Sequence, residues 1–255
     1  MALEKSFQGK NEMSKILDII STLQDTFLAR KWRSSSKGSK IDGVVLMYHH
    51  ITDEYVDINL SCRCPVKVFE HYLDEYLNRG YKFVSVDEAY NIIVGEAATV
   101  PFCVLTFDDI PDNVYQNAYP ILRKRGIPFT VFVSTNFVDY YNPETKIQFV
   151  TREHLLEMDK DPLCTVGAHT VSHLMLKKVK NSFEEMKDNK KWLESFLDHR
   201  VDYLAYPFGR HSSINKKVQR QAALAGFKCA FSSIGAPVND ISSKCLFFLP
   251  RLVRN

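Results

Sequence analysis

Short apolar runs alternate with amphipathic stretches along the main part of the sequence. The runs have the length and composition of buried strands, and they are Val44–Tyr48, Tyr81–Val84, Cys103–Phe107, Phe129–Val133, Thr165–Gly167, Tyr203–Tyr206, Phe227–Phe231 and Leu246–Leu249. The stretches between them carry helix boundary signals. Pro65 opens one that Gly80 closes, and two others close at Gly126 and Gly226. Seven or eight such units predict a parallel α/β sheet, and a chain of this length favours a barrel over an open sheet.

The N-terminal segment has a different pattern. Between residues 13 and 32 an apolar stripe has helical spacing. Its members are Ile16, Ile20, Leu23 and Phe27, and they are flanked by Met13, Leu17, Ile19 and Leu28. Residues 29–40 follow with five bases, four serines and no acid, which is typical of a solvated linker. We expect the helix to pack on the main domain or to mediate self-association, because apolar stripes mostly face protein. The alternative is peripheral membrane contact, since neighbouring bases attract anionic lipid.

The composition is that of an ordinary globular protein. Of 255 residues, 45% are hydrophobic and 25% are charged, which excludes a disordered, collagenous or coiled-coil chain. Residues 1–40 carry a net charge of +4, so the remainder has a net charge of only −1. We therefore expect no nucleic-acid partner, because the main domain lacks the basic surface that such binding needs.

The spacing of the cysteines and the first residues of the sequence indicate the cellular compartment of the protein. The six cysteines form no Cys-x-x-Cys pair and most lie in apolar runs, so buried, reduced thiols are expected. The opening residues lack the basic and apolar regions of a secretory signal, and no apolar stretch reaches membrane-spanning length. The sequence therefore predicts a cytoplasmic protein, with peripheral membrane contact through residues 13–32 as the alternative noted above.

Polar residues cluster where four of the predicted strands end. Tyr48-His-His50, Asp108-Asp109, Gly167-Ala-His169 and Tyr206-Pro-Phe-Gly209 each follow an apolar run. Function in parallel βα architectures collects at the carboxyl ends of the strands. One pocket can therefore gather all four clusters.

Two pairs of side chains have metal-ligand chemistry. Asp108 and Asp109 point in different directions, so one can bind a metal while the other faces substrate, although such a pair can also merely cap a helix. His169 and His173 are spaced so that a helical turn places both imidazoles on one face. The same spacing also occurs in histidine pairs that have a purely structural role. Two His with Asp109 form a site with open positions for a divalent metal, with zinc expected and cobalt, nickel or iron as alternatives.

The remaining clusters supply groups for hydrolysis of an acyl group. Asp108 is the candidate general base for a water molecule, and His49 is placed to donate a proton to a leaving group. A histidine at a strand end can equally be a polar rim residue. Pro207 makes the fourth cluster a rigid turn, in which the N–H of Phe208 can face an oxyanion.

These motifs carry a resemblance to a known family. Thr106-Phe-Asp-Asp109, His169-Thr-Val-Ser-His173 and Tyr206-Pro-Phe-Gly209, in this order, resemble the first three motifs of the NodB-homology polysaccharide deacetylases, carbohydrate esterase family 4. The likeness spans about residues 41–255, which would be the catalytic domain, with residues 1–40 as the amphipathic helix and basic linker. It implies a distorted (β/α)7 barrel and a divalent metal that serves to hydrolyse the N-acetyl group of an N-acetylhexosamine.

The resemblance also implies roles for individual residues. Asp108 resembles the catalytic base and Phe208 the backbone oxyanion donor, while the implied metal ligands are Asp109, His169 and His173. Val45-Leu-Met-Tyr-His49 and Leu249-Pro-Arg251 are similar to the permuted branch that deacetylates poly-N-acetylglucosamine. In that branch the acid histidine comes from the first strand, which selects His49.

The sequence departs from the family pattern at three places. The usual C-terminal Leu-x-His motif has no match. The arginine that often precedes the third-motif proline is also absent, and our hypothesis is that Arg251 orients Asp108 instead. Ile110 stands where the family usually has glycine.

Other functions are compatible with the same residues. The barrel could deacylate a small amide or imide or an O-acetyl ester, or it could be a glycan-binding relative without activity. Without a secretion signal, the substrate expected is a cytoplasmic sugar nucleotide or a lipid-linked saccharide precursor rather than a finished extracellular polymer.

Overall fold

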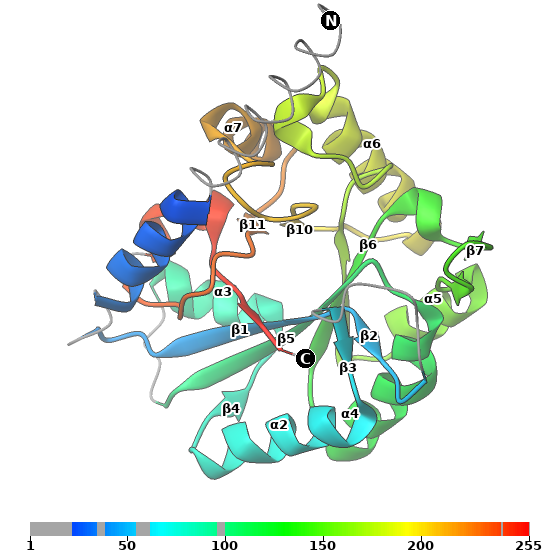
Figure 1. Cartoon of the computed structure of the whole chain (residues 1–255), viewed down its shortest axis with the longest axis horizontal. Coiled ribbons are helices and arrows are strands. Elements are labelled where there is room, and N and C mark those ends of the chain that lie inside the picture. Colours follow the sequence, from blue (N-terminus) through cyan, green and yellow to red (C-terminus); the bar gives the residue numbers. More distant parts are fainter. Residues whose placement is uncertain (1–21, 35–38, 55–61, 96–99, 241, 255) are drawn as a thin grey trace, which may run out of the picture.

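The computed structural model describes residues 22–34, 39–54, 62–95, 100–240 and 242–254. Its centre is a parallel sheet in the order β11-β10-β9-β6-β5-β1-β12, with β4 also paired to β5 (Figure 1). The strands of this sheet are β1 (Gly43–Tyr48), β4 (Lys82–Phe83), β5 (Phe102–Asp108), β6 (Phe129–Val133), β9 (Cys164–Ala168), β10 (Tyr203–Ala205), β11 (Cys229–Phe231) and β12 (Leu252–Val253). The predicted parallel α/β architecture is confirmed.

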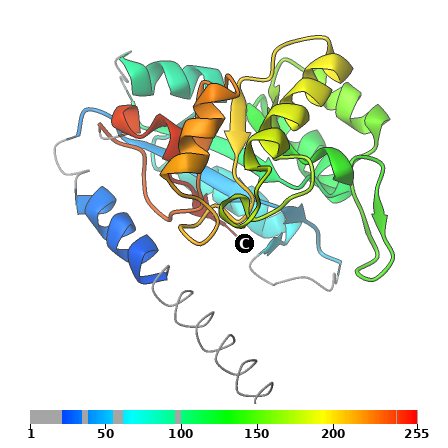
Figure 2. The ribbon, with the colours of Figure 1, turned by 90° about the horizontal axis from the view of Figure 1, so that it is seen from above.

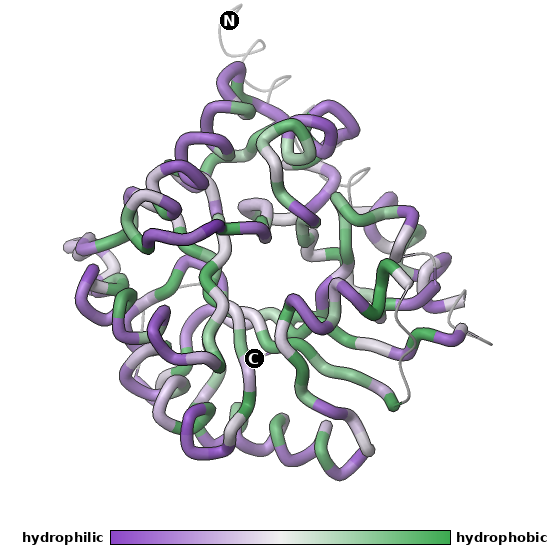
Figure 3. Tube along the Cα trace, turned by 180° about the vertical axis from the view of Figure 1, so that it is seen from behind, coloured by the Kyte–Doolittle hydropathy of each residue, from purple (hydrophilic) through white to green (hydrophobic). Residues whose placement is uncertain are grey.

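Helices surround the sheet and alternate with its strands. They are α2 (Val66–Asn78), α3 (Val86–Val94), α4 (Tyr119–Arg125), α5 (Arg152–Asp159), α6 (Ser182–Leu197) and α7 (Lys216–Leu224). Helix α2 begins after Pro65, as expected, and Gly126 ends α4 in the left-handed conformation. Figure 3 shows apolar positions concentrated in the strands and polar positions on the outer helices. The helices thus shield the strands from water.

The sheet curls into a distorted barrel whose closure is incomplete. β12 pairs with β1 in parallel, through Leu46 and Leu252. On the other side, a single parallel bridge between Phe231 and Leu249 connects β11 to the segment that leads into β12. Pro250 follows that bridge and has no N–H to continue a ladder. The barrel is therefore closed at this point by isolated contacts rather than by a full pair of strands.

The alternation of side chains along each strand separates two cores. Cys103, Leu105 and Phe107 of β5 belong to the outer core, which includes residues of α2, α4, α5, α6 and α7. Phe102 and Val104 belong to the inner core, which residues of α3 also join. Because successive side chains point to opposite faces, Thr106 and Asp108 share the inner face with Phe102 and Val104. The strand periodicity therefore directs Asp108 into the barrel.

Two small sheets lie near the ends of the barrel strands. One pairs β2 (His50–Ile51) with β3 (Arg63–Cys64) in parallel, and the other is a hairpin of β7 (Tyr141–Asn142) and β8 (Ile147–Gln148). All six cysteines are free thiols, but the predicted burial holds for only three of them, Cys64, Cys103 and Cys229.

The predicted strand Leu246–Leu249 is wrong. Leu246–Phe248 is a 3₁₀ turn in which the N–H of Phe248 donates to the carbonyl of Cys245, and the closing strand is β12 further along. A short apolar run without alternation is compatible with either one helical turn or a strand. Phe247 and Phe248 contact the outer core whereas Leu246 contacts the inner one, and a turn can bury both sides at once.

The N-terminal helix covers residues 22–34 and lies against the wall of the barrel (Figure 2). It therefore extends beyond the expected start of the linker at Ala29, and the Trp32 side chain is only 3% exposed. Leu28 and Ala29 pack on the main core, and Asn239 donates a side-chain hydrogen bond to the Trp32 carbonyl over 2.9 Å. The upstream half of the expected stripe lies outside the described residues. Among the described residues, no helix is long and apolar enough to cross a membrane.

Candidate metal centre and catalytic pocket

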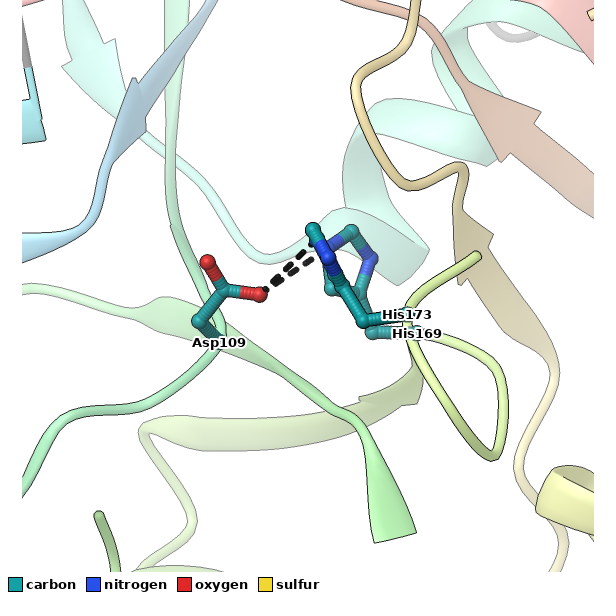
Figure 4. Close-up of side chains that lie close together, drawn as sticks. All are labelled: Asp109, His169 and His173. Atoms are coloured by element: carbon teal, nitrogen blue, oxygen red, sulfur yellow. Dashed lines mark ion pairs between the residues drawn. The ribbon is translucent and has the colours of Figure 1, made fainter. Parts of the chain in front are cut away.

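Asp109, His169 and His173 converge at the carboxyl ends of β5 and β9 (Figure 4). The Nε2 atoms of His169 and His173 lie 3.4 and 3.2 Å from Oδ1 of Asp109. One ligand atom from each of the three residues fits within 4.8 Å of the others. This spacing suits a single cation, for which two imidazoles and one carboxylate are common ligands.

The hydrogen bonds around this cluster leave its ligand atoms directed at one another. Nδ1 of His169 lies 2.8 Å from the Ala205 carbonyl, which can only accept, so Nδ1 carries the proton and the Nε2 lone pair faces Asp109. Oδ1 of Asp109 is buried and has no hydrogen-bond partner among the described residues. A buried carboxylate oxygen without a partner is costly, and a cation at this point would satisfy it. These residues therefore fit a divalent metal.

The pKa values reflect the same concentration of negative charge. Burial alone would lower the pKa of His169, but the Asp108 and Asp109 carboxylates outweigh it and the pKa of His169 is raised. Burial alone would raise the pKa of Asp109, but His169 and His173 hold it well below its usual range. The two carboxylates thus favour positive charge on His169, whereas burial and the neighbouring His169 lower the pKa of His173.

The loop that carries the two histidines is not the predicted helical turn. Residues 169–173 are irregular, with Thr170 and His173 at positive φ values of 69° and 52°. The N–H of His173 donates to the Thr170 hydroxyl over 3.2 Å, and the N–H of Ser172 donates to the Glu185 carboxylate over 2.9 Å. These bonds curl the loop and bring both rings to one cation position by a different route.

Asp108 lies beside the cluster and is paired with Arg251 from the end of the chain. The guanidinium donates two hydrogen bonds to the carboxylate, over 2.7 and 2.6 Å, and both side chains are almost fully buried. Arg251 is itself fixed by donating to the Ser232 carbonyl and to the Thr106 hydroxyl. The hypothesised contact between Arg251 and Asp108 is therefore present, and its catalytic role stays a prediction.

This arginine keeps Asp108 ionised. Burial alone would raise the pKa of Asp108, but the charges of Arg251 and His169 outweigh it and the pKa is lowered. Asp108 is thus available as a proton acceptor at neutral pH. Its Oδ2 lies 4.0 Å from Nε2 of His169, next to the candidate metal position.

Strand parity distinguishes the two adjacent histidines after β1. His49 follows Val45 and Met47 in the two-residue period, and both His49 and Met47 line the pocket that contains Asp108 and the metal cluster. His50 also borders this pocket but is buried, and its Nδ1 lies 3.0 Å from the side-chain nitrogen of Asn113. Since an amide nitrogen only donates, that bond fixes the neutral ring with its proton on Nε2.

His50 makes a separate, pH-dependent contribution to stability. Burial and the neighbouring His49 lower the pKa of His50 to about 4, whereas an unfolded histidine titrates near 6.5. As the pH falls from 6.5 towards 4, the unfolded chain takes up a proton that the folded chain refuses, so stability is lost over this window. We expect the wild type to lose about 2 kcal/mol more than His50→Gln between pH 7 and pH 5. Urea unfolding at both pH values measures this, and equal losses would contradict it.

The Tyr206-Pro-Phe-Gly209 turn brings Phe208 to the same pocket. Phe208 has a φ of 63° and its side chain is 48% exposed, and its ring centroid lies 4.9 Å from that of His173. In the described part of the chain nothing accepts a hydrogen bond from the Phe208 N–H. Pro207 is buried directly before it. The geometry is compatible with the predicted oxyanion donor.

Two residues that support this machinery were missed by sequence reasoning. Asn189 of α6 accepts from the His169 N–H and donates to the Val133 carbonyl. It lies in the apolar stripe of Met186, Leu193 and Leu197, and a polar residue in such a stripe was an available signal. Ser233 is the second. It follows β11 without any motif, so no local signal pointed to it.

Ser233 holds the Phe208 turn from both sides. Its hydroxyl donates to the Phe208 carbonyl over 2.7 Å, and its N–H donates to the Gly209 carbonyl over 2.8 Å. A Cβ atom on Gly209 would lie 2.4 Å from the Ser233 nitrogen, and Gly209 also has a φ of +64°. Only glycine satisfies both conditions.

We therefore expect Gly209→Ala to lower the turnover of the enzyme proposed below at least about ten-fold, because the displaced turn misaligns the Phe208 N–H. Metal content should be unchanged, since Gly209 contacts none of the candidate ligands. Gly126→Ala is the matched control, because Gly126 has the same φ of +64° with nothing within 4 Å of the added Cβ. Steady-state kinetics and metal analysis of both variants test this, and equal turnover in the two would refute it.

A pocket of about 410 Å³ at the carboxyl ends of the strands is lined by His49, Asp108, Asp109, His169, His173, Phe208 and Arg251, among others. A match to the polysaccharide deacetylase family model covers residues 96–230, more than half of the chain. The chain belongs to the polysaccharide deacetylase family. The expected family is thus confirmed, and the matched residues include all three of the motifs that carried the resemblance.

Curated relatives agree with this membership. YxkH of Bacillus subtilis, named as a putative polysaccharide deacetylase, is 28% identical over 200 residues, which are 77% of this chain and 66% of that protein. The poly-β-1,6-N-acetyl-D-glucosamine N-deacetylase of Staphylococcus aureus is 27% identical over 58% of this chain and 53% of its own. The chain thus spans between about half and two thirds of the length of these relatives.

Solved structures share the fold. The Streptococcus pyogenes deacetylase PplD, solved in complex with acetate, matches with a TM-score of 0.73 and 26% identity, over 84% of this chain and 92% of that one. IcaB from Ammonifex degensii matches with a TM-score of 0.72 at 23% identity, over 85% and 93% of the two chains. The expected distorted barrel of the polysaccharide deacetylase type is confirmed.

Proposed function

We propose that this protein is a metal-dependent hydrolase that removes the N-acetyl group from an N-acetylhexosamine-containing saccharide. One observation carries the proposal: the cluster of Asp109, His169 and His173 lies in one pocket with the buried Asp108–Arg251 pair. Membership of the polysaccharide deacetylase family supports the same reaction class. The substrate named for the Staphylococcus aureus relative, a poly-N-acetylglucosamine, supports an N-acetylated saccharide here.

Asp109, His169 and His173 would hold the metal, and we propose zinc because two imidazoles and a carboxylate are common zinc ligands. Cobalt, nickel and iron suit the same donors. When bound, the metal supplies Lewis acidity, which polarises a carbonyl group and lowers the pKa of water. The fixed Nδ1 proton of His169 orients its Nε2 for this task.

The other residues would handle protons and charge. Asp108, kept ionised by Arg251, accepts the proton of the water that attacks the acetyl carbonyl. The N–H of Phe208 donates to the oxygen that becomes negative, and the buried Pro207 before it stiffens the turn. His49 lines the same pocket and delivers a proton to the departing amine, which leaves acetate and the free amino sugar.

Acetate release and metal content, measured on one preparation, test this function. The wild type and Asp108→Asn are purified, their metal is quantified, and each is incubated with mono- and oligosaccharides of N-acetylglucosamine and with O-acetylated analogues. We expect about one divalent metal per chain in both proteins and acetate from N-acetylated saccharides with the wild type alone.

The other outcomes separate the competing functions. Acetate from O-acetylated compounds alone would identify an esterase. Bound metal with no acetate from any saccharide would favour a small-amide deacylase, and the absence of bound metal would leave a glycan-binding domain.

A further inference from the structure

The N-terminal helix, residues 22–34, presents two different faces. Successive residues turn by about 100° around an α-helix, which places Asp25, Ala29 and Trp32 together on one side. This side meets the barrel: Oδ1 of Asp25 lies 2.6 Å from Nδ1 of His211, and Trp32 is buried. The barrel therefore does not cover Leu23 and Phe27, the described members of the apolar stripe that the sequence predicted would pack on it.

The opposite face carries the described members of that stripe. Leu23 and Phe27 are 64% and 71% exposed, and they lie about one turn apart on the helix. Leu224 is the other large apolar side chain with comparable exposure in the described residues, at 77%, and it is on α7. In the sequence the same spacing continues upstream through Met13, Ile16 and Ile20, which lie outside the described residues.

The charges on this helix are arranged asymmetrically. Arg30 and Lys31 are exposed, and their positions place them within about 60° of Phe27 around the helix axis. The single acid of residues 22–34 is Asp25, and it is paired with His211 on the barrel side. The outer face thus combines exposed apolar side chains with bases and has no acid of its own.

We propose that this outer face, formed by Leu23, Phe27, Arg30 and Lys31, binds an anionic lipid surface. An apolar face flanked by bases inserts at the boundary of headgroups and acyl chains, and the bases are attracted to acidic headgroups. The proposal concerns this surface alone and does not depend on the proposed deacetylase activity.

A second copy of the chain fits this face less well. Leu17 and Ile19 flank the stripe upstream in the sequence and widen it, whereas the seam of a helix pair is narrow and bordered by opposite charges. In a parallel pair, Arg30 and Lys31 of one copy would also meet the same bases of the other. Lipid with acidic headgroups relieves that repulsion.

The helix that carries this surface lies next to a loop of the catalytic pocket. His211, which holds Asp25, directly follows Arg210, and Arg210 lines the pocket. Arg33 of the same helix donates to the Gly235 carbonyl over 2.7 Å, two residues after Ser233. Attachment through this helix would therefore keep the pocket close to the lipid surface.

Vesicle co-sedimentation of the full chain tests the proposal. The vesicles are phosphatidylcholine alone, or phosphatidylcholine and phosphatidylglycerol in equal parts. We expect binding to the mixed vesicles and little to the neutral ones. Leu23→Gln combined with Phe27→Gln should weaken binding at least about ten-fold. Arg30→Gln combined with Lys31→Gln should weaken it by roughly five-fold for each base removed.

Leu224→Gln is the matched control, because Leu224 is equally exposed on another helix. It should bind as the wild type does, and circular dichroism should show that all variants are folded. Wild-type protein that stays in the supernatant with both vesicles would overturn the proposal, as would unchanged binding by the Leu23/Phe27 variant. A dimer in sedimentation velocity that this variant dissociates, without vesicle binding, would instead make the face a contact between copies.

Discussion

Arg251→Leu is expected to lower the free energy of unfolding by about 3 to 5 kcal/mol and to abolish most acetate release. The Arg251 side chain is fully buried and makes two charge-assisted hydrogen bonds to Asp108, which is itself only 3% exposed. Removing the arginine leaves a buried carboxylate without its counter-charge, which is the costly way to break such a pair. Burial would then raise the pKa of Asp108, and the carboxylate would lose its fixed orientation.

Two controls separate the charge effect from simple loss of packing. Combining Arg251→Leu with Asp108→Leu removes both charges, and we expect most of the lost stability to return while activity stays absent. Arg79→Ala breaks the exposed pair between Arg79 and Glu75 and should cost less than about 1 kcal/mol. Urea unfolding monitored by circular dichroism measures all four proteins. If the double variant were as unstable as Arg251→Leu, the charge argument would be wrong.

The second large effect is a separation of metal binding from turnover. His169→Ala is expected to lose both the bound metal and acetate release, because its Nε2 is one of the three atoms directed at the metal position. His49→Ala is expected to keep metal near the wild-type level and to lower turnover by about 10²- to 10⁴-fold, the usual contribution of a general acid. His49 lines the pocket but is not part of the metal cluster.

Metal content per chain and the rate of acetate release are measured on the same samples. His71→Ala is the control for loss of a histidine, because His71 is exposed on α2. It should match the wild type in both measurements. Equal metal loss in His49→Ala and His169→Ala would refute the division of roles between them.

Several features of the site could be predicted because they follow from local periodicity. The apolar runs at β1, β5 and β9 were long enough to identify as strands, and their carboxyl ends placed the motifs at one edge. Once a strand is assigned, its two-residue period fixes which side chains face inward. The opposite directions of Asp108 and Asp109 follow from this period, whereas the choice of His49 over His50 came from the resemblance to the permuted deacetylase branch.

The conformations of the connecting loops were not predictable in the same way. The helical turn expected for His169 to His173 is replaced by a loop held by Thr170 and Glu185. Glu185 belongs to α6, so the bonds that impose positive φ on this loop come partly from a distant segment. A local spacing rule contains no information about such partners.

The extent and orientation of the N-terminal helix were also not predictable from local sequence. The basic composition after Ala29 predicted a linker, yet the helix continues because Trp32 finds a buried site and Asn239 caps its carbonyl from the far end of the chain. Helical stability comes mostly from tertiary packing of one face. The sequence identified an apolar stripe, and only the packing revealed that the barrel takes the opposite face.

The succession of strands along the chain from β1 to β11, the chemistry at their ends and the family could therefore be predicted from the amino-acid sequence, since burial patterns and motif spacings are local properties of the chain. The sequence also suggested Arg251 as the partner of Asp108, but only the barrel closure, which pairs Leu252 with Leu46, brings that arginine to the inner end of β5. The tertiary structure alone decided the curled histidine loop, the Ser233 support of the Phe208 turn and the exposed face of the N-terminal helix. Each of these depends on contacts with a segment outside the motif itself, and a local spacing rule cannot specify such contacts.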